Sequence, residues 1–329
     1  MGPVKVFDLH CDTIDALSMR DVPPYSALGL GAEQDLVSNT LQLALDRMRQ
    51  AGSWVQCFAV WVPDDLSAFP GGPLSFYRHA RDYFKAQMAR HAGLVTQVRD
   101  ARDVDGVLAE GRIAAILTVE NGSPIGNDLG VVDEWEADGV KMVTLTWNGP
   151  NTIASGHDTT QGLSSFGRQV VRALEDRRMV VDVSHLNDVG FWDLMKVVRR
   201  PIAASHSNLR AICGHRRNLT DDQFRAIMDT GGIVGLNYYC DFLKDGAPRP
   251  DEVSFDDLSA HLERFLDLGG EDFVALGSDF DGSTTPAWLA SCDDLPALFE
   301  RVAARFGQDL AQKLFFDNAR AFFVRNETA

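Results

Sequence analysis

Short apolar runs alternate with longer stretches of helical periodicity along the whole chain. The runs are rich in β-branched residues and are apolar at consecutive positions, which is typical of parallel strands covered by helices on both faces. The predicted strands are residues 4–9, 54–61, 113–119, 140–146, 179–184, 202–205, 233–238 and 273–278.

Two of the intervening stretches predict helices with particular clarity. Residues 165–178 place their large apolar side chains on one helical face. Thr220 and Gln223 form a capping-box pattern that opens another helix, and Gly231 ends it.

Eight strands alternating with helices predict a (β/α)8 TIM barrel, an α/β fold, in one domain of residues 1–329. A doubly wound sheet is the alternative, but its dinucleotide fingerprint is missing. Gly29 and Gly31 follow no predicted strand and lack a third glycine. Long Gly/Pro-rich loops nearly all follow a strand, which would place them on the catalytic face of a barrel: 21–31, 63–73, 148–162, 240–250 and 282–296.

Composition narrows the classes of function. The 329 residues hold 31 Lys and Arg against 47 Asp and Glu, a net charge of −16, so a nucleic-acid partner is not expected. No apolar run reaches the ~20 residues of a membrane span, and the N-terminus lacks the regions of a signal peptide. Five scattered cysteines without a Cys-x-x-Cys pair indicate a reducing compartment. We therefore expect a cytoplasmic protein without a membrane partner.

Side chains that can bind metal ions stand at the carboxyl ends of five predicted strands. A single histidine or aspartate at a strand end is more often a loop or cap residue than a ligand. Here the parallel strands of a barrel would bring all the strand ends together. The candidates are His10, Asp12, Glu120, His185, His206 and Asp279.

For other polar residues the sequence gives weaker evidence of a place in the functional site. His79, His91 and His261 lie in charged, helical surroundings and are expected at the surface. For His157 and His215 a role in loop structure is favoured over a place in a pocket wall. Cys11 is expected to pack, because the middle residue of an extended segment points away from its neighbours. After the seventh strand, candidates for a pocket wall are Tyr238, Tyr239 and Asp241, with packing the alternative for the tyrosines.

Seven segments resemble the renal (membrane) dipeptidase family, peptidase family M19, within the amidohydrolase superfamily. In this chain they read FDLHCDT (7–13), TVENG (118–122), GLSSFG (162–167), VDVSH (181–185), PIAASHS (201–207), RRNL (216–219) and GSDFDG (277–282). The resemblance covers nearly the whole chain.

The resemblance implies a barrel of the metal-dependent hydrolase type with two Zn²⁺ ions. His10 and Asp12 would hold one ion and His185 and His206 the other, with Glu120 and a water or hydroxide bridging them. The implied activity is that of a zinc-dependent dipeptidase, for substrates that can carry a D-residue at the C-terminal position. A homodimer is also implied.

Further roles follow from the same resemblance. Arg217 would bind the free α-carboxylate of the dipeptide, and its neighbour Asn218 is expected to contact substrate. Asp279 would carry the proton, while Asp281 would shape the turn.

One position departs from the family pattern. Trp147 stands where the mammalian members have a histidine that helps to bind the scissile carbonyl. An indole has one N–H donor and cannot take up a proton, so Trp147 would donate a hydrogen bond or form an apolar wall. This leaves two alternatives to a dipeptidase. One is a binuclear-metal amidohydrolase for an N-acyl amino acid, a lactam or another amide, and the other is a metal-stabilised scaffold without enzymatic activity.

Overall fold

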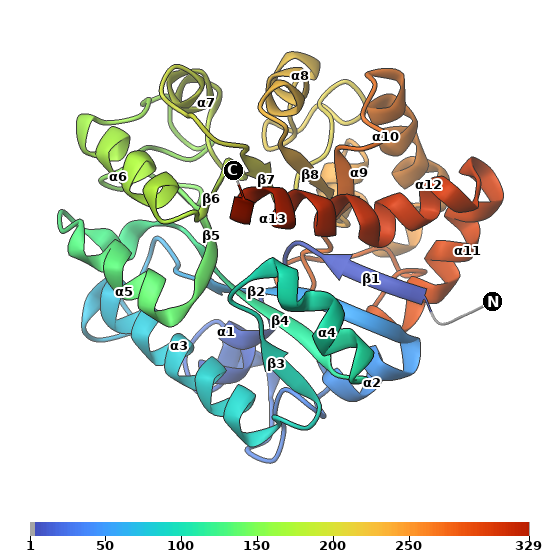
Figure 1. Cartoon of the computed structure of the whole chain (residues 1–329), viewed down its shortest axis with the longest axis horizontal. Coiled ribbons are helices and arrows are strands. Elements are labelled where there is room, and N and C mark those ends of the chain that lie inside the picture. The colour runs from blue at the N-terminus through green and yellow to red at the C-terminus, as the bar shows by residue number, and fades with distance from the viewer. Residues whose placement is uncertain (1–3, 329) are drawn as a thin grey trace.

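The computed structural model describes residues 4–328, and eight of its strands close into a parallel barrel (Figure 1). The barrel closes because β2 pairs with both β1 and β4, so the prediction of a TIM barrel is confirmed. The barrel strands are β1 (Val4–Asp8), β2 (Gly52–Trp61), β4 (Ile113–Glu120), β5 (Val140–Thr144), β6 (Val180–Asp182), β7 (Ala203–Ala204), β8 (Ile233–Leu236) and β9 (Val274–Leu276).

A ninth strand, β3 (Val95–Gln97), was not predicted. It pairs with the first residues of β4, beside the stretch of β4 that pairs with β5. Three residues are too few to show a strand pattern in the sequence.

Helices surround the barrel and cover the outer faces of the strands (Figure 1). The α-helices are α1 (Thr13–Ser18), α2 (Leu45–Ala51), α3 (Gly72–Arg90), α4 (Val104–Ala109), α5 (Gly130–Asp138), α6 (Ser165–Asp176), α7 (Asp188–Met195), α8 (Asp221–Asp229), α9 (Cys240–Leu243), α10 (Phe255–Asp267), α11 (Leu295–Phe306), α12 (Gln308–Gln312) and α13 (Asn318–Thr328). Short 3-10 helices span Tyr25–Leu28, Ala101–Asp103, Ser123–Ile125, Pro250–Glu252 and Cys292–Asp294, and a π-helix spans Lys313–Asp317. Both predicted helices are confirmed, as α6 and as α8 with its Thr220–Gln223 capping box.

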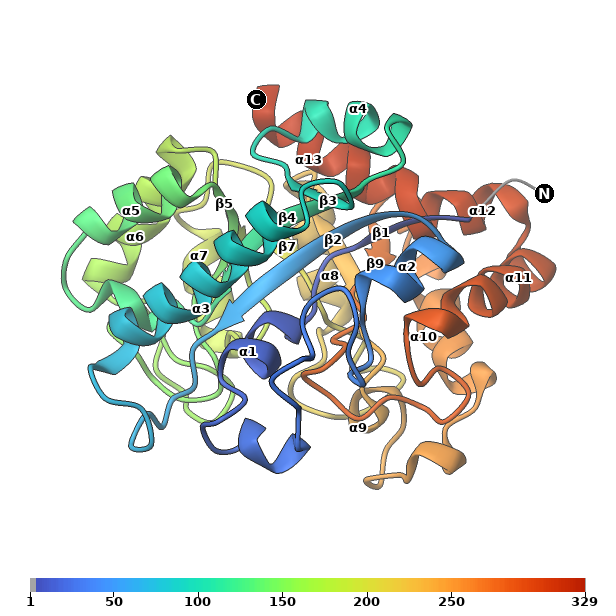
Figure 2. The same cartoon turned by 90° about the horizontal axis from the view of Figure 1, so that it is seen from below.

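Helix α13 closes the amino-terminal end of the barrel. Its Phe323 stacks on Phe7 of β1, with ring centroids 5.4 Å apart, and both belong to the apolar cluster that fills the barrel interior. Figure 2 shows α4 and α13 at this end and the loops that follow the strands at the opposite end. The carboxyl end of the barrel is therefore the one left open for a site.

Several strands are shorter than predicted, because side chains replace the backbone ladder where the strands end. The Asp182 carboxylate accepts hydrogen bonds from the backbone N–H groups of Ser184 and Ser205, at 3.0 and 2.9 Å. Asp8 accepts the N–H of Ser278 at 2.8 Å in the same way. These bonds turn the chain out of the sheet directly before the candidate ligands.

The remaining sequence expectations have mixed outcomes. Cys11 is fully buried in the core, so its packing role is confirmed. His79 is exposed, but the prediction of a surface position for His261 is wrong. His261 lies on the inner face of α10, where its Nδ1 accepts the N–H of Leu209 and its Nε2 contacts the carbonyl of Leu243. The charged residues around His261 in the sequence therefore led to a wrong prediction for a buried imidazole.

None of the helices within residues 4–328 combines the length and apolar character that crossing a membrane requires. Residues 1–3, on which the expected lack of a signal peptide partly rests, lie outside the described residues.

Candidate functional site

A cavity of about 610 Å³ opens at the carboxyl ends of the strands. Residues from the segments after six strands line it, together with the last residues of β2 and β4, as expected for the catalytic face of a barrel. Of the five predicted loops, 63–73 contributes no residue to this lining. Its floor carries Asp12, Glu120, His185 and Asp279. Two buried imidazoles, those of His10 and His206, contact these floor residues from behind.

Glu120, the last residue of β4, lies between the two predicted ligand pairs. Its Oε2 is 3.2 Å from Nε2 of His10, which is itself 3.4 Å from Oδ2 of Asp12. Its Oε1 is 2.8 Å from Nε2 of His185 and 3.7 Å from Nε2 of His206. The fold thus brings all five predicted metal ligands together, with Glu120 at the centre.

Hydrogen bonds fix the tautomers of His185 and His206. Nδ1 of His185 donates to Oδ1 of Asn148 at 2.9 Å. Nδ1 of His206 lies 2.8 Å from Oγ of Ser205, whose own hydroxyl donates to Asp182. Both Nε2 atoms are therefore left with lone pairs, and they face each other at 3.0 Å.

The charge states of these imidazoles favour a cation. Burial lowers the pKa of His185 and of His206 well below the usual value, so both are neutral at pH 7. Two lone pairs at this distance repel each other unless a cation accepts both. The donor set therefore fits a divalent metal ion.

The second half of the site also offers buried donor atoms to a cation. Nε2 of His10 and Oδ1 of Asp12 are buried and make no hydrogen bond within residues 4–328. Burial lowers the pKa of His10, but Asp12 and Glu120 outweigh it, and the net pKa lies well above the usual value. The carboxylates thus stabilise a positive charge here, which a metal ion would supply in place of the proton. Ligand atoms of His10, Asp12 and Asp279 lie within 4.8 Å of one another.

Asp279 follows β9 in a left-handed backbone conformation, with φ at 60°. Strained positions of this kind, at an aspartate rather than a glycine, are common at active sites. Its Oδ2 accepts a hydrogen bond of 3.0 Å from Nδ2 of Asn237, which the sequence did not single out. Burial, opposed by His10 and reinforced by Asp12, raises the pKa of Asp279 to about 6. A carboxyl group with this pKa can take up and release a proton near neutral pH.

Asp281 has a different environment. Its two oxygens accept the hydroxyl of Thr13 at 2.5 Å and the backbone N–H of Gln42 at 2.6 Å. These bonds tie two loops together, in keeping with a role in shaping the turn.

Arg217 is a buried cation without an ionic partner. Its Nη1 donates to Oγ of Ser207 and its Nη2 to the carbonyl of His206, both at 3.2 Å, while Nε makes no hydrogen bond. No carboxylate within residues 4–328 forms an ion pair with it, and burial lowers its pKa to about 10. An unpaired buried guanidinium is costly, so the site favours an anion next to Arg217.

Asn218 lies behind the cavity rather than in its lining. Its Nδ2 donates to the carbonyls of Cys213 and Phe242, both at 2.9 Å. In this position it holds two wall segments together, next to Arg217.

An aromatic wall forms one side of the cavity. Trp147 lies edge-on to Trp61, with ring centroids 4.9 Å apart, and Trp61 lies edge-on to Tyr25 at 6.2 Å. Trp147 also lies 6.2 Å from the ring of His185. Of these residues only Trp147 was expected at the site, because Tyr25 and Trp61 carry no sign of chemistry in the sequence.

Other residues of the lining correct one prediction and resolve another. His157 and His215 line the cavity, so the preference for a role in loop structure was wrong. Tyr239 and Asp241 also line it, whereas Tyr238 is fully buried in the core. Loop residues of this kind could be placed only by the fold.

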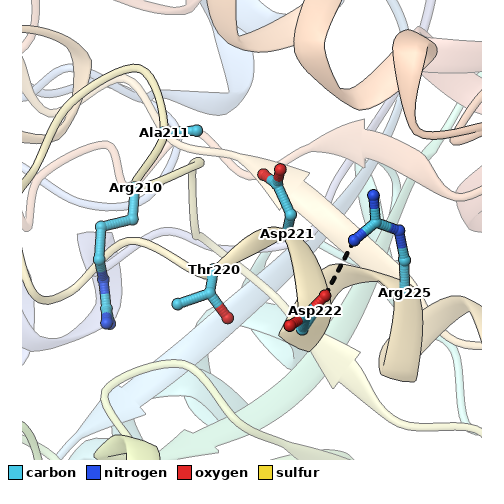
Figure 3. A pocket seen from close by; sticks show the side chains of 6 residues that line it. All are labelled: Arg210, Ala211, Thr220, Asp221, Asp222 and Arg225. Carbon is cyan, nitrogen blue, oxygen red and sulfur yellow. Dashed lines mark hydrogen bonds and ion pairs between the residues drawn. The ribbon is translucent and has the colours of Figure 1, made fainter.

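A second hollow, of about 430 Å³, lies at the start of α8 (Figure 3). Both arginine side chains that line this hollow form ion pairs with aspartates. Arg225 donates to Asp222 at 2.9 Å, and Arg210 is paired with Asp188 at 2.8 Å. It contains none of the candidate ligands, so we place the functional site in the larger cavity.

Comparisons with known proteins identify the family to which the chain belongs. The family model of the membrane dipeptidases, peptidase family M19, matches residues 1–326. A metallopeptidase from Rhodobacter sphaeroides, crystallised with a phosphinate mimic of the dipeptide L-Ala-D-Ala, is 28% identical. The match covers 98% of this chain and 99% of that one, with a TM-score of 0.88.

Two further proteins show the same likeness. A crystallised dipeptidase of family M19 is 29% identical, with 99% of each chain covered and a TM-score of 0.89. An uncharacterised dipeptidase from Schizosaccharomyces pombe is 31% identical over 92% of this chain and 75% of its own length. The chain therefore belongs to the membrane dipeptidase family, peptidase family M19, and is a hydrolase of the metallo-dipeptidase type.

Proposed function

We propose that this protein is a zinc-dependent dipeptidase that hydrolyses small dipeptides, including those with a D-residue at the C-terminal position. The observation that carries the proposal is the buried guanidinium of Arg217, which has no ion pair in the described part of the chain and contacts the backbone of His206. A free α-carboxylate would supply the missing anion and place the peptide bond near the ligand cluster.

Two zinc ions would be held by the five converging side chains. His10 and Asp12 would hold one ion, His185 and His206 the other, and Glu120 would bridge both. When bound, the ions supply a Lewis acid for the peptide carbonyl and lower the pKa of an attacking water.

Residues of the chain itself would bind the substrate and transfer the proton. Arg217 would hold the substrate carboxylate through its planar fork of N–H donors, with Asn218 keeping that segment in place. Asp279 would accept the proton of the attacking water and return it to the leaving amine, while Asn237 orients its carboxylate. Trp147 would pack against the substrate as part of the aromatic wall.

The proposal that the substrate can carry a D-residue at its C-terminal position is supported by the similarity of this chain to a solved structure. The Rhodobacter sphaeroides metallopeptidase was crystallised with a mimic of L-Ala-D-Ala, and it is similar to this chain along almost its entire length.

The direct test is a substrate panel with the zinc-loaded protein. We expect L,L- and L,D-dipeptides to be cleaved, and N-acyl amino acids and lactams to be turned over much more slowly. Faster turnover of amides without a free amino terminus would instead support an amidohydrolase of another specificity. An absence of all hydrolysis at two zinc ions per chain would support a scaffold.

Replacing the proposed carboxylate anchor should weaken substrate binding. For Arg217→Met we expect kcat/KM for dipeptides to fall by about a hundredfold, mainly through KM, since truncating one partner of a buried charge pair costs several kcal/mol. The matched control is Arg216→Met, because Arg216 is exposed and pairs only with Asp158 at the rim. Equal losses in both variants would contradict the role of Arg217.

Metal uptake by the apoprotein should strengthen as the pH rises. Burial raises the pKa of Glu120 to about 7, so below this pH a proton occupies the carboxylate that a metal ion needs. We expect the apparent zinc affinity to rise at least tenfold between pH 6 and pH 8, with proton release. Calorimetric titrations in buffers of different ionisation enthalpy would measure both, and an affinity independent of pH would contradict the expectation.

A further inference from the structure

The cavity wall that contains His157, His215 and Tyr239 also carries Asp241, a carboxylate that the proposed mechanism does not use. We infer that Asp241 selects dipeptides whose C-terminal residue has a cationic side chain. This inference rests on the proposed function, because it takes the substrate to be a dipeptide held by Arg217.

Asp241 belongs to the cavity wall, and one of its two carboxylate oxygens has no hydrogen-bond partner within residues 4–328. It lies in α9, and its Oδ2 accepts a hydrogen bond of 2.9 Å from the hydroxyl of Tyr239. Its Oδ1 forms no hydrogen bond or ion pair with any residue in the described part of the chain. The carboxylate is thus oriented by one partner and still able to accept a donor from a ligand.

Asp241 lines the cavity, whereas the proposed carboxylate anchor, Arg217, is buried and lies outside the lining. The ring of Phe242 links the two, because the guanidinium of Arg217 lies 5.3 Å from its centroid and the ring of Tyr239 lies 4.8 Å from it. A dipeptide whose α-carboxylate meets Arg217 therefore has its C-terminal residue beside this wall. The N-terminal residue extends toward the aromatic wall.

The electrostatic surroundings leave the charge of Asp241 uncompensated. Among the residues that line the cavity in the range 4–328 there is no lysine or arginine. His215 also belongs to this wall, with its ring centroid 4.8 Å from that of Phe242, and burial lowers its pKa. His215 is therefore neutral at pH 7 and does not offset the negative charge of Asp241.

The other acidic groups of the lining are already engaged. Asp12, Glu120 and Asp279 belong to the ligand cluster, and Asp281 is hydrogen-bonded to Thr13 and Gln42. Asp241 is therefore the carboxylate that remains for a substrate group. A guanidinium or ammonium group on the C-terminal residue matches it in charge and hydrogen-bonding capacity.

The test compares charged and neutral side chains of the same shape. Ala-Arg, Ala-citrulline and Ala-Gly would be assayed with zinc-loaded protein, with L- and D-forms of the two longer residues. We expect kcat/KM for the better Ala-Arg isomer to exceed that for the matching citrulline peptide by about tenfold, roughly 1.4 kcal/mol. In Asp241→Asn, which still accepts the Tyr239 hydroxyl, the ratio should fall to about one.

The matched control is Asp251→Asn. Asp251 is an exposed aspartate in the same segment after β8 and pairs with Arg249, so the arginine-to-citrulline ratio should stay at the wild-type value. The inference is overturned by a wild-type ratio near one, or by Asp241→Asn lowering kcat/KM for all the peptides that are cleaved by one common factor. If no dipeptide is cleaved at full zinc loading, the proposed function itself fails, which is a distinguishable result.

Discussion

Asp279→Asn is expected to lower kcat for dipeptides by about a thousandfold while zinc content and KM stay close to those of the wild type. Asparagine has nearly the same shape and can still hydrogen-bond to Asn237, but it cannot take up a proton. Removal of a general acid–base group of this kind typically costs 10²- to 10⁴-fold. Steady-state kinetics and metal analysis of the purified variant would measure the effect.

The variant Asp281→Asn distinguishes the role of Asp281 from that of Asp279, the other aspartate of the segment GSDFDG (277–282). Asp281 is occupied by Thr13 and Gln42, so we expect less than about a tenfold loss of kcat. A larger loss in Asp281→Asn than in Asp279→Asn would reverse the assignment of the proton carrier. Loss of zinc from Asp279→Asn would instead show that Asp279 is a ligand, a role that its closeness to His10 and Asp12 also allows.

Glu120→Gln should abolish the metal centre as a unit. The carboxylate lies within 3.2 Å of His10 and 2.8 Å of His185, so its charge serves both proposed ions. An amide of the same size keeps the packing but offers one neutral oxygen. We expect zinc content to fall from two ions to less than one per chain, and kcat/KM to fall by at least a thousandfold, since several kcal/mol of Lewis-acid stabilisation is lost.

The control for this variant is Glu134→Gln on α5, which removes the same charge from ion pairs with Arg78 and Arg81. It should leave zinc content and activity unchanged. A Glu120→Gln protein that keeps two zinc ions and most of its activity would show that Glu120 does not bridge the ions.

The barrel and the ligand set could be expected from sequence for one physical reason. Strands that are apolar on both faces must be covered by helices, and parallel strands in a closed barrel end at the same mouth. His10, Glu120 and His206 each stand at or just after a strand end, so their convergence follows from chain order once the barrel is assumed. The capping box of α8 is a local feature and could be predicted in the same way.

Other features depend on contacts between distant segments. That Arg217 has no ionic partner within residues 4–328 depends on all the segments that surround it, and no local pattern could show it. The tautomer of His206 depends on Ser205 and on Asp182 of a different strand. The buried position of His261 depends on its contacts with the Leu209 and Leu243 segments.

The sequence by itself determined the strand order, the end of the barrel that carries the chemistry, and the residue types that meet there. Only the tertiary structure decided which loop side chains face the cavity, and so it alone placed His157, His215 and Asp241 in one wall. The reason is that strand periodicity is a local property of the chain. Loop conformation depends on partners far away in sequence, so the wall that contacts a substrate exists only once the barrel has closed.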